Sequence, residues 1–237
     1  MTFFTKESID FLVDIRENNN KEWFENNRYR YDDFILNPSR AFVQEFGEHL
    51  QALVPNIKAI PKINGSLFRI FRDIRLSKDK TPMKSRIGLV FWRGSGKRLQ
   101  SASFYLHFSP DELLFASGIR GFSKDSLEGY REYIKEPRHA GELDAIMVTL
   151  KEKGYSFPEP HYKRYPRGFS KESPYAHLSL YASMFAYKNV EPEMIYHDSI
   201  MDRAFGIYED LLPLFEWIYA MSLTFEIKDP KGKSLHL

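Results

Sequence analysis

The chain has 237 residues, 43 % of them hydrophobic and 16 % aromatic, which is enough for a sizeable folded core. It contains no cysteine, which excludes disulfides, thiolate nucleophiles and cysteine-ligated metal sites and favours a cytoplasmic location. A net charge of +2 does not by itself identify a nucleic-acid-binding protein. The first twenty residues lack the pattern of a signal peptide and no long apolar run occurs, so we expect no membrane partner.

The N-terminal quarter predicts three amphipathic helices. Thr5 is a suitable N-cap with Ser8 three residues later, and apolar residues follow at helical spacing until three asparagines end the first helix. A second helix is expected over residues 21–36, where Asn37 and Pro38 should stop it. A third is expected over residues 39–54. We interpret the apolar stripes of all three as core.

The middle of the chain changes from helical to strand-like patterning. Leu67, Ile70, Phe71 and Ile74 fit one face of a helix, which favours one or two helical turns, although Phe68 breaks this pattern and leaves a strand as the alternative. Residues 77–82 are typical of a loop. Three runs rich in strand formers follow, joined by short turns, and they predict an antiparallel meander. Their ranges are 86–92, 101–108 and 112–119.

The C-terminal half predicts more helix. The expected elements are helices over 124–136, 139–153, 174–183 and 199–221, an edge strand over 185–190, and a long loop over 155–173 that is rich in Tyr, Lys and Arg. The predicted fold class is therefore α+β, with an antiparallel sheet around residues 86–119 packed by N-terminal and C-terminal helices. We expect a single compact domain over residues 1–227 and a flexible tail over 228–237.

The most distinctive feature is a concentration of positive charge. Between Lys62 and Arg98 there are eleven lysines and arginines but two acids, Asp73 and Asp79. Arginine forks bind phosphate or carboxylate, lysines add point charges, and a turn such as SKDKTP can offer backbone amides. The sequence thus predicts an anion-binding site, which the basic part of the 155–173 loop would close. The candidate residues are Arg69, Arg72, Asp73, Arg75, Lys78, Asp79, Lys80, Lys84, Lys163, Arg164 and Arg167.

The other motifs give weaker evidence of a functional site. The GSGK run at residues 94–97 lacks the full spacing of a phosphate-binding loop and fits a hairpin turn better. His107, His161, His177 and His197 have no ligand-type spacing, so no metal site is expected. No catalytic or dinucleotide-binding fingerprint is present, and neither a cofactor nor a reaction follows from the sequence.

Three segments resemble a known family in the same order. FRIFRDIRLSKDKTPMK, SFYLHFSPDELLFASGI and YKRYPRGFSKESP are similar to the uncharacterised family called domain of unknown function 2461. The resemblance implies a cytoplasmic single-domain protein of bacterial type, with no established activity. Met83 and Ser183 depart from the family pattern, where Tyr and Lys are expected. The pattern falls on Arg69, Arg72, Asp73, Arg75, Ser77, Lys78, Asp79, Lys80, Pro82, Lys84, Pro166, Arg167, Gly168 and Phe169.

Three functions remain open on this basis. The first is a module, binding or catalytic, for a small phosphorylated or carboxylated ligand. The second is a nucleic-acid-binding protein in which Tyr162, Tyr165 and Phe169 stack on bases beside a basic loop. The third is a structural or interaction domain, in which the Arg and Asp residues form a salt-bridge lattice that only stabilises the fold while the surface serves a partner.

Overall fold

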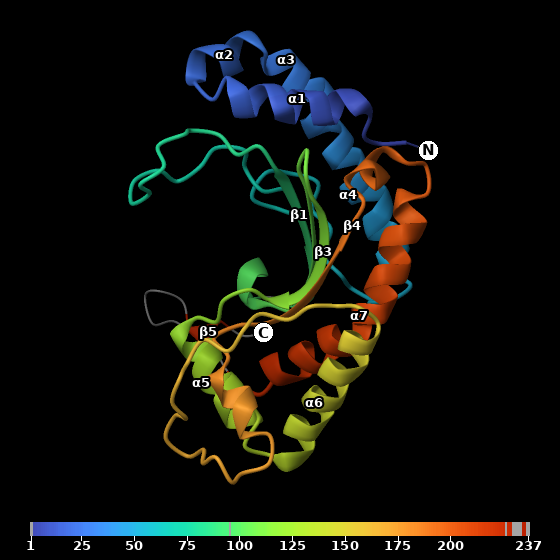
Figure 1. The fold of residues 1–237 in the computed structure, drawn as a ribbon. Coiled ribbons are helices and arrows are strands. Elements are labelled where there is room, and N and C mark those ends of the chain that lie inside the picture. Colours follow the sequence, from blue (N-terminus) through green and yellow to red (C-terminus); the bar gives the residue numbers. More distant parts are fainter. Residues whose placement is uncertain (1, 95, 226, 229–233, 236–237) are drawn as a thin grey trace. The chain divides into compact units, whose positions relative to one another are not determined.

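A computed structural model describes residues 2–94, 96–225, 227–228 and 234–235 (Figure 1). The chain divides into two compact units, each of which is described by itself. The first unit comprises Met1–Phe91, Tyr105–Phe115 and Asn189–Ile207. The second comprises Trp92–Phe104, Ala116–Lys188 and Tyr208–Leu237. The expectation of a single domain over residues 1–227 stays a prediction.

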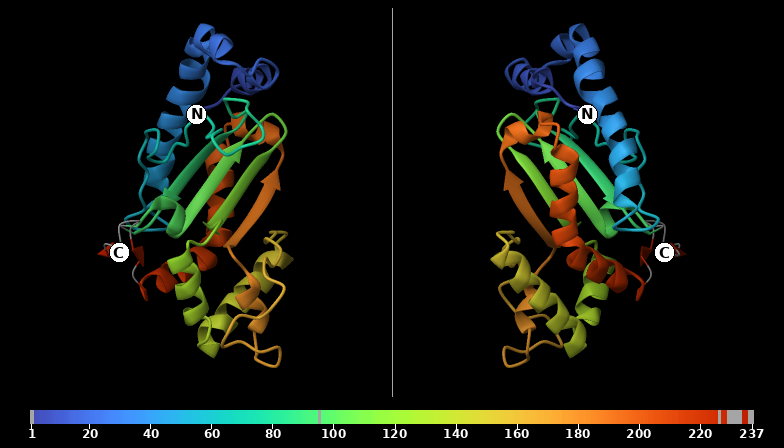
Figure 2. Two further views of the ribbon diagram at one scale, coloured as in Figure 1. Left: turned by 90° about the vertical axis from the view of Figure 1, so that its left-hand side faces the viewer. Right: turned by 90° about the vertical axis from the view of Figure 1, so that its right-hand side faces the viewer.

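The predicted antiparallel sheet is confirmed. It has four strands in the order β1-β2-β3-β4, and Figure 2 shows them side by side. The expected edge strand is β4, at one end of this order. Four of the five boundaries between the two units fall within these strands, and the fifth, between Ile207 and Tyr208, falls within the last helix, α7 (Ile200–Ser222). The strands are β1 (Ile87–Trp92), β2 (Ser103–Phe108), β3 (Leu113–Ile119) and β4 (Met184–Val190).

The close spacing of β3 and β4 depends on a glycine in the second unit. Gly118 has φ +132°, and a Cβ added there would lie 2.3 Å from the carbonyl oxygen of Met184. Because that neighbour is backbone, a larger residue could not be accommodated by a side-chain movement.

Among the N-terminal helices of the first unit, α1 and α2 begin where the sequence predicts. The helix expected over 21–36 is interrupted at Asn27, and the helix expected over 39–54 begins at Asn37 and ends at Leu50. Thr5 precedes α1, and its backbone amide donates to Ser8 Oγ at 3.1 Å. The Asn20 side chain caps α2 by accepting from the Trp23 amide at 2.9 Å. Core aromatic residues fix α4, where Phe42 stacks on Phe46. The elements are α1 (Lys6–Glu17), α2 (Lys21–Asn26), α3 (Arg28–Tyr31), the π-helical turn η1 (Asp32–Leu36) and α4 (Asn37–Leu50).

The expected helix stop at Asn37 and Pro38 is wrong, because the chain stays helical from η1 into α4. Proline has no amide hydrogen, so the carbonyl four residues earlier, that of Phe34, loses its usual donor. The buried hydroxyl of Ser8 donates to that oxygen at 2.7 Å and replaces the missing bond. The π-helical turn just before Pro38 places the Asn37 amide on the carbonyl of Asp32.

The second unit is built on helices around an aromatic core. Phe104 stacks on Tyr208 and on Phe215, with ring centroids 4.5 Å apart in both pairs. The predicted helices over 124–136 and 139–153 are confirmed, and Gly154 follows the second with φ +81°. The elements are η2 (Arg98–Gln100), α5 (Lys124–Tyr133), α6 (Pro137–Glu152), η3 (Ala176–Leu180), and the part of α7 from residue 208 onward.

The helix expected over 174–183 is wrong, since only the short 3₁₀ helix η3 forms there. Tyr175, directly before it, has φ +60°, which prevents an α-helix from starting at Pro174. The Ser179 hydroxyl then donates to the carbonyl of Ala176 at 2.7 Å. This local bond competes with continued helical pairing.

The remaining elements are short apart from the last helix. The turn η4 (Pro192–Tyr196) precedes α7 (Ile200–Ser222), close to the predicted 199–221. The backbone of β5 (Ile227–Lys228) pairs antiparallel with that of β6 (Ser234–Leu235). Most of the expected flexible tail, residues 229–233 and 236–237, lies outside the described residues. Within the described part of the chain, no helix has both the length and the apolar character needed to span a bilayer.

Candidate functional site

The predicted anion-binding segment of the first unit is a β-hairpin, which we call the basic hairpin (residues 66–90). The helical turns expected over 67–76 are absent from it. The Phe68 amide donates to the Gly88 carbonyl at 3.0 Å, and the Val90 amide donates to the Ser66 carbonyl at 2.9 Å. Leu67 faces Leu89 in an antiparallel bridge. The arm before the turn therefore runs antiparallel to β1.

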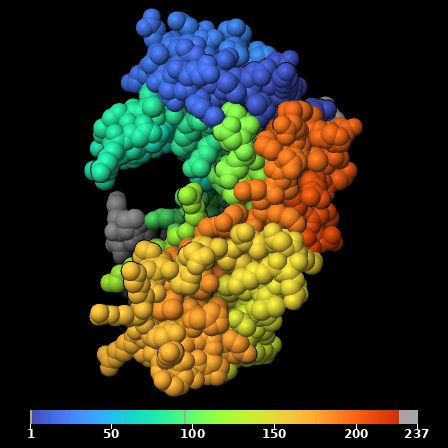
Figure 3. All heavy atoms as spheres, in the orientation of Figure 1, coloured from blue at the N-terminus to red at the C-terminus, as the bar shows by residue number. Residues whose placement is uncertain are grey.

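The same hairpin continues beyond the end of β1. The Arg72 amide donates to the Pro82 carbonyl at 2.8 Å, and the Lys84 amide donates to the Ile70 carbonyl at 2.9 Å. These pairs are two residues out of step with those at Phe68 and Gly88, so the returning arm contains a bulge before β1. The tip, residues 69–84, holds the eight candidate charges of the hairpin and is drawn in teal in Figures 1 and 3.

An asparagine from the turn between α1 and α2 anchors the hairpin. Asn19 Nδ2 donates to the Met83 carbonyl at 3.0 Å, and Asn19 Oδ1 accepts from the Met83 amide at 2.9 Å. Phe24 of α2 packs edge-on against Phe71, with ring centroids 5.3 Å apart. The side chain of Met83 is buried. The departure from the family pattern at this position therefore lies inside the unit and not at its surface.

Arg72 is the first of two arginines held by the tip's aspartates. Its Nη1 pairs with Asp79 Oδ2 and also donates to Thr81 Oγ1 at 2.8 Å. Asp79 Oδ1 accepts from the Thr81 amide at 2.9 Å and from the Thr81 hydroxyl at 2.7 Å. The Thr81 hydrogen bonds, together with Arg72, lower the pKa of Asp79 to about 2. Asp79 is therefore ionised at neutral pH.

Arg75 forms the second pair at the tip. Its Nε donates to Asp73 Oδ1 at 2.9 Å and its Nη2 to Asp73 Oδ2 at 2.6 Å, a bidentate arrangement. The hydrogen bonds from the Arg75 side chain and amide hold the pKa of Asp73 well below its usual range. Both pairs lie at the surface. The two aspartates also occupy the Arg75 and Thr81 amides. Of these, the Thr81 amide belongs to the SKDKTP turn, whose amides the sequence predicted to be available to an external anion.

Five other cations of the hairpin lie outside these two ion pairs: Arg69, Lys78, Lys80, Lys84 and Arg86. Lys80 Nζ donates to the Ile74 carbonyl at 2.8 Å, and Lys84 Nζ donates to the Arg69 carbonyl at 2.9 Å. Arg69 and Lys78 are exposed, and among the described residues no carboxylate lies within ion-pair distance of either. Leu76, between them along the tip, is fully exposed. The tip thus carries more positive than negative charge.

The sequence cluster from Lys62 to Arg98 is not one structural group. Arg93 belongs to the second unit, where its Nη1 pairs with Glu216 Oε1 at 3.1 Å and its guanidinium lies 3.9 Å from the centroid of Tyr219. Lys97 and Arg98 also belong to that unit. The candidate residues Arg69 to Lys84 all belong to the first unit.

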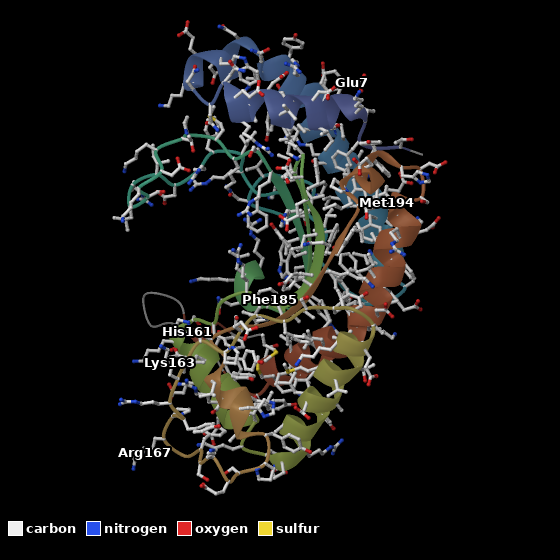
Figure 4. All side chains as sticks on the ribbon, viewed as in Figure 1. Glu7, His161, Lys163, Arg167, Phe185 and Met194 are labelled. Carbon is white, nitrogen blue, oxygen red and sulfur yellow. The ribbon has the colours of Figure 1, made fainter. Side chains whose placement is uncertain are left out.

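The other predicted cations lie in the second unit, on a segment that we call the basic loop (residues 161–175). Lys163, Arg164 and Arg167 are exposed there. Figure 4 shows the labelled side chains of Lys163 and Arg167 pointing away from α5 and α6. Because the basic hairpin and the basic loop belong to different units, closure of one over the other stays a prediction.

The histidines behave as structural residues where their contacts are described. His107 is buried on β2, and its Nε2 lies 2.7 Å from Glu112 Oε2. His177 Nε2 lies 3.1 Å from Asp144 Oδ1 at the surface. Within the described residues, no group of three or more His, Asp or Glu side chains could hold a metal ion.

Comparison with known proteins identifies the family. The family model of the conserved hypothetical protein DUF2461 matches residues 7–217. The chain belongs to this family. Both the basic hairpin and the basic loop lie within the part that matches DUF2461. A comparison with curated proteins gave no match.

Sequence reasoning missed the residues that hold the DUF2461 hairpin in place. Asn19 lies in a run of three asparagines, which signals only a helix end, and nothing in the sequence links it to Met83. Thr81 could have been found, because a Thr two residues after an Asp is typical of a side-chain turn. Arg131 of α5, whose guanidinium lies 4.6 Å from the centroid of Tyr162, also has no sequence signal.

Proposed function

We propose that this protein binds a small anionic ligand, phosphorylated or carboxylated, through the tip of the basic hairpin. Arg69 and Lys78 make direct contacts with the anion, and Lys80 and Arg72 lie beside them. The proposal includes no chemical reaction. It includes the cytoplasmic location that the absence of cysteine favours.

One observation carries the proposal: the tip holds more cations than its carboxylates neutralise. Asp79 and Asp73 are each taken by one arginine, which leaves Arg69 and Lys78 exposed without an ion pair in the described part of the chain. Exposed cations on one short segment attract anions and raise their local concentration. The bonds of Lys80 and Lys84 to backbone carbonyls limit the freedom of these side chains and so reduce the entropic cost of binding.

The exposure of the ion pairs argues against a purely structural lattice. Surface ion pairs contribute little to stability, because water and salt screen them. Arg72 with Asp79 and Arg75 with Asp73 are both of this kind. They are better suited to holding the shape of the tip than to stabilising a core, and the Asx-type bonds to Thr81 and Arg75 act in the same direction.

Urea unfolding of the full chain, with and without inorganic phosphate at constant ionic strength, tests the proposal. We expect phosphate to raise the unfolding midpoint of the wild type, because a ligand that binds only the native state stabilises it. The double variant Arg69→Gln, Lys78→Gln should keep its midpoint without phosphate and lose the phosphate effect. Asp79→Asn keeps the acceptor for Thr81 but removes a negative charge, so phosphate should stabilise this variant more than the wild type.

The matched control removes two exposed cations elsewhere in the first unit, Lys6→Gln with Arg40→Gln. This control should retain the full phosphate effect. If phosphate leaves the wild-type midpoint unchanged, or if the control loses the effect as completely as the hairpin variant, the proposed site is wrong.

A further inference from the structure

A second surface is carried by the basic loop, which turns sharply in the second unit. The Phe169 amide donates to the Pro166 carbonyl at 3.1 Å, and Gly168 has φ +90°, as the third residue of a type II turn requires. Arg167 is the second residue of this turn and lies at its corner. A Cβ added to Gly168 would lie 3.5 Å from Lys135 Cε, which brings a cation from just beyond the end of α5 beside the turn.

The base of the loop is fixed to η3 and α5. The amides of His161 and Tyr162 both donate to the Leu180 carbonyl at 2.9 Å. Arg131 Nη2 donates to the Ser179 carbonyl at 3.3 Å, and the same guanidinium covers the ring of Tyr162. The loop therefore leaves a held base, and its exposed side chains start from defined positions.

The exposed cations of the loop differ from those of the hairpin because no acid holds any of them. Within the described residues, no carboxylate lies within ion-pair distance of these side chains, and this includes Glu172, the one acid of the loop. Long side chains stand out from this part of the surface in Figure 3. The four cations are Lys163, Arg164, Arg167 and Lys171.

Aromatic rings alternate with these charges. Tyr165 lies between Arg164 and Arg167 with 38 % of its surface exposed, and no ring contact to it occurs among the described residues. Tyr175 is 37 % exposed at the far end of the loop. An exposed ring beside unpaired cations is the arrangement on which an unpaired base stacks while its phosphates meet the charges.

We infer that the basic loop is a binding surface for single-stranded nucleic acid. Lys163, Arg164, Arg167 and Lys171 contact the phosphate backbone, and Tyr165 stacks on a base. A duplex keeps its bases stacked on each other and offers the ring no partner, so the surface prefers single strands. An acidic peptide would satisfy the cations but would leave the tyrosine without a function. The inference does not depend on the basic hairpin.

Fluorescence anisotropy of a short labelled oligothymidylate, titrated with the full chain at low salt, tests this inference. The loop variant carries three substitutions, Lys163→Gln, Arg164→Gln and Arg167→Gln. It should bind more weakly, and the slope of log K against log salt should become smaller in magnitude by about 2, because each phosphate that is no longer neutralised accounts for roughly 0.7. The control, Lys124→Gln, Arg138→Gln and Lys151→Gln, removes the same charge from exposed positions on α5 and α6 and should retain the wild-type slope.

The stacking interaction has its own pair of variants. Tyr165→Leu keeps an apolar side chain but removes the ring, and should weaken binding by roughly 5-fold to 150-fold, the range for loss of one base–aromatic stack. Tyr29→Leu, at an exposed tyrosine of the first unit, should have no effect. A duplex of equal length should bind more weakly than the single strand.

Three results would overturn the inference. One is the absence of any anisotropy change at low salt. Another is loss of oligonucleotide binding in the hairpin variant Arg69→Gln, Lys78→Gln but not in the loop variants, which would assign the binding to the hairpin. The third is equal affinity for duplex and single strand together with a silent Tyr165→Leu. Each of these can occur whether or not phosphate stabilises the protein, so the two proposals fail separately.

Discussion

The side chain of Asn19 acts as a short strand partner for Met83. It bonds both backbone groups of that residue, whose side chain is buried. A buried amide and carbonyl left without partners cost far more than an exposed pair, because water cannot replace the missing bonds. This one residue therefore connects the helical N-terminus to the arm that carries the candidate anion site.

Replacing Asn19 with alanine should destabilise the protein by about 1–3 kcal/mol, the cost of leaving buried polar groups unsatisfied. Urea unfolding measures the loss of stability. The substitution should also accelerate hydrogen exchange at the Met83 amide more than at the Leu89 amide. The control is Asn18→Ala, where the exposed side chain bonds only to the Asp14 carbonyl and the loss should stay below about 0.5 kcal/mol. Equal effects of the two substitutions would contradict the anchoring role.

At the scale of elements, the basic hairpin shows why an apolar pattern can mislead. Leu67, Ile70 and Phe71 fall at helical spacing, yet the segment pairs with residues 82–90 as an extended arm. The periodicity reports burial only in part, because Leu67 and Ile70 are buried whereas Phe71 is 38 % exposed. The sequence does not show which segment pairs with this arm, because strands pair through backbone groups that all residues share.

The helix that continues through Pro38 is a second case in which a local sequence signal misleads. A proline after a helical run usually ends the helix, and here a hydroxyl from α1 supplies the missing bond to Phe34. The strands of the meander were predicted correctly, because each strand run was flanked by Gly, Ser, Pro or Asp, but the connection between β1 and β2 contains the unexpected 3₁₀ helix η2. Local signals were thus sufficient for β1 to β3, and a contact distant in sequence decided the course of the chain at Pro38.

The approach of β3 to β4 gives a test at the same scale. Gly118→Ala should destabilise the protein by at least about 1–3 kcal/mol, since the new Cβ would collide with the Met184 carbonyl at a backbone angle that favours glycine. Gly206→Ala is the control, because this helical glycine has no atom within 4 Å of the added Cβ. It should stabilise by up to about 1 kcal/mol. A neutral Gly118→Ala, measured by urea unfolding, would show that the strands can separate without cost.

At the scale of the whole molecule, the composition predicted a core rich in aromatic residues. The order of the residues showed where positive charge is concentrated along the chain. The net charge of +2 conceals two local excesses of positive charge, one on the basic hairpin and one on the basic loop. The candidate residues could be named from the sequence, but their ion pairs could not. Asp73 and Asp79 each lie within a few residues of several arginines and lysines, and turn geometry selects the pairs.

Buried tyrosines make the stability of the molecule depend on alkaline pH. Burial, with a smaller effect of Asp32, raises the pKa of Tyr31 from 10.0 to about 12, and burial also raises the pKa of Tyr130. Because the folded protein favours the neutral form of Tyr31 more than the unfolded chain does, the stability that this preference contributes is complete below pH 10. It is lost as the pH rises through about 12. Urea midpoints measured across this range should fall less steeply for Tyr31→Phe than for the wild type. The exposed control Tyr29→Phe should follow the wild-type curve, and an identical curve for all three proteins would contradict the assignment.

The central claim, that the tip of the basic hairpin binds anions, is tested most directly by amide chemical shifts of ¹⁵N-labelled full-length protein during a titration with inorganic phosphate, with chloride at equal ionic strength as the reference. We predict saturable shifts concentrated at residues 69–84, and their loss in the variant Arg69→Gln, Lys78→Gln. Shifts that are absent, that do not saturate, or that scatter over exposed lysines and arginines throughout the chain would contradict the claim.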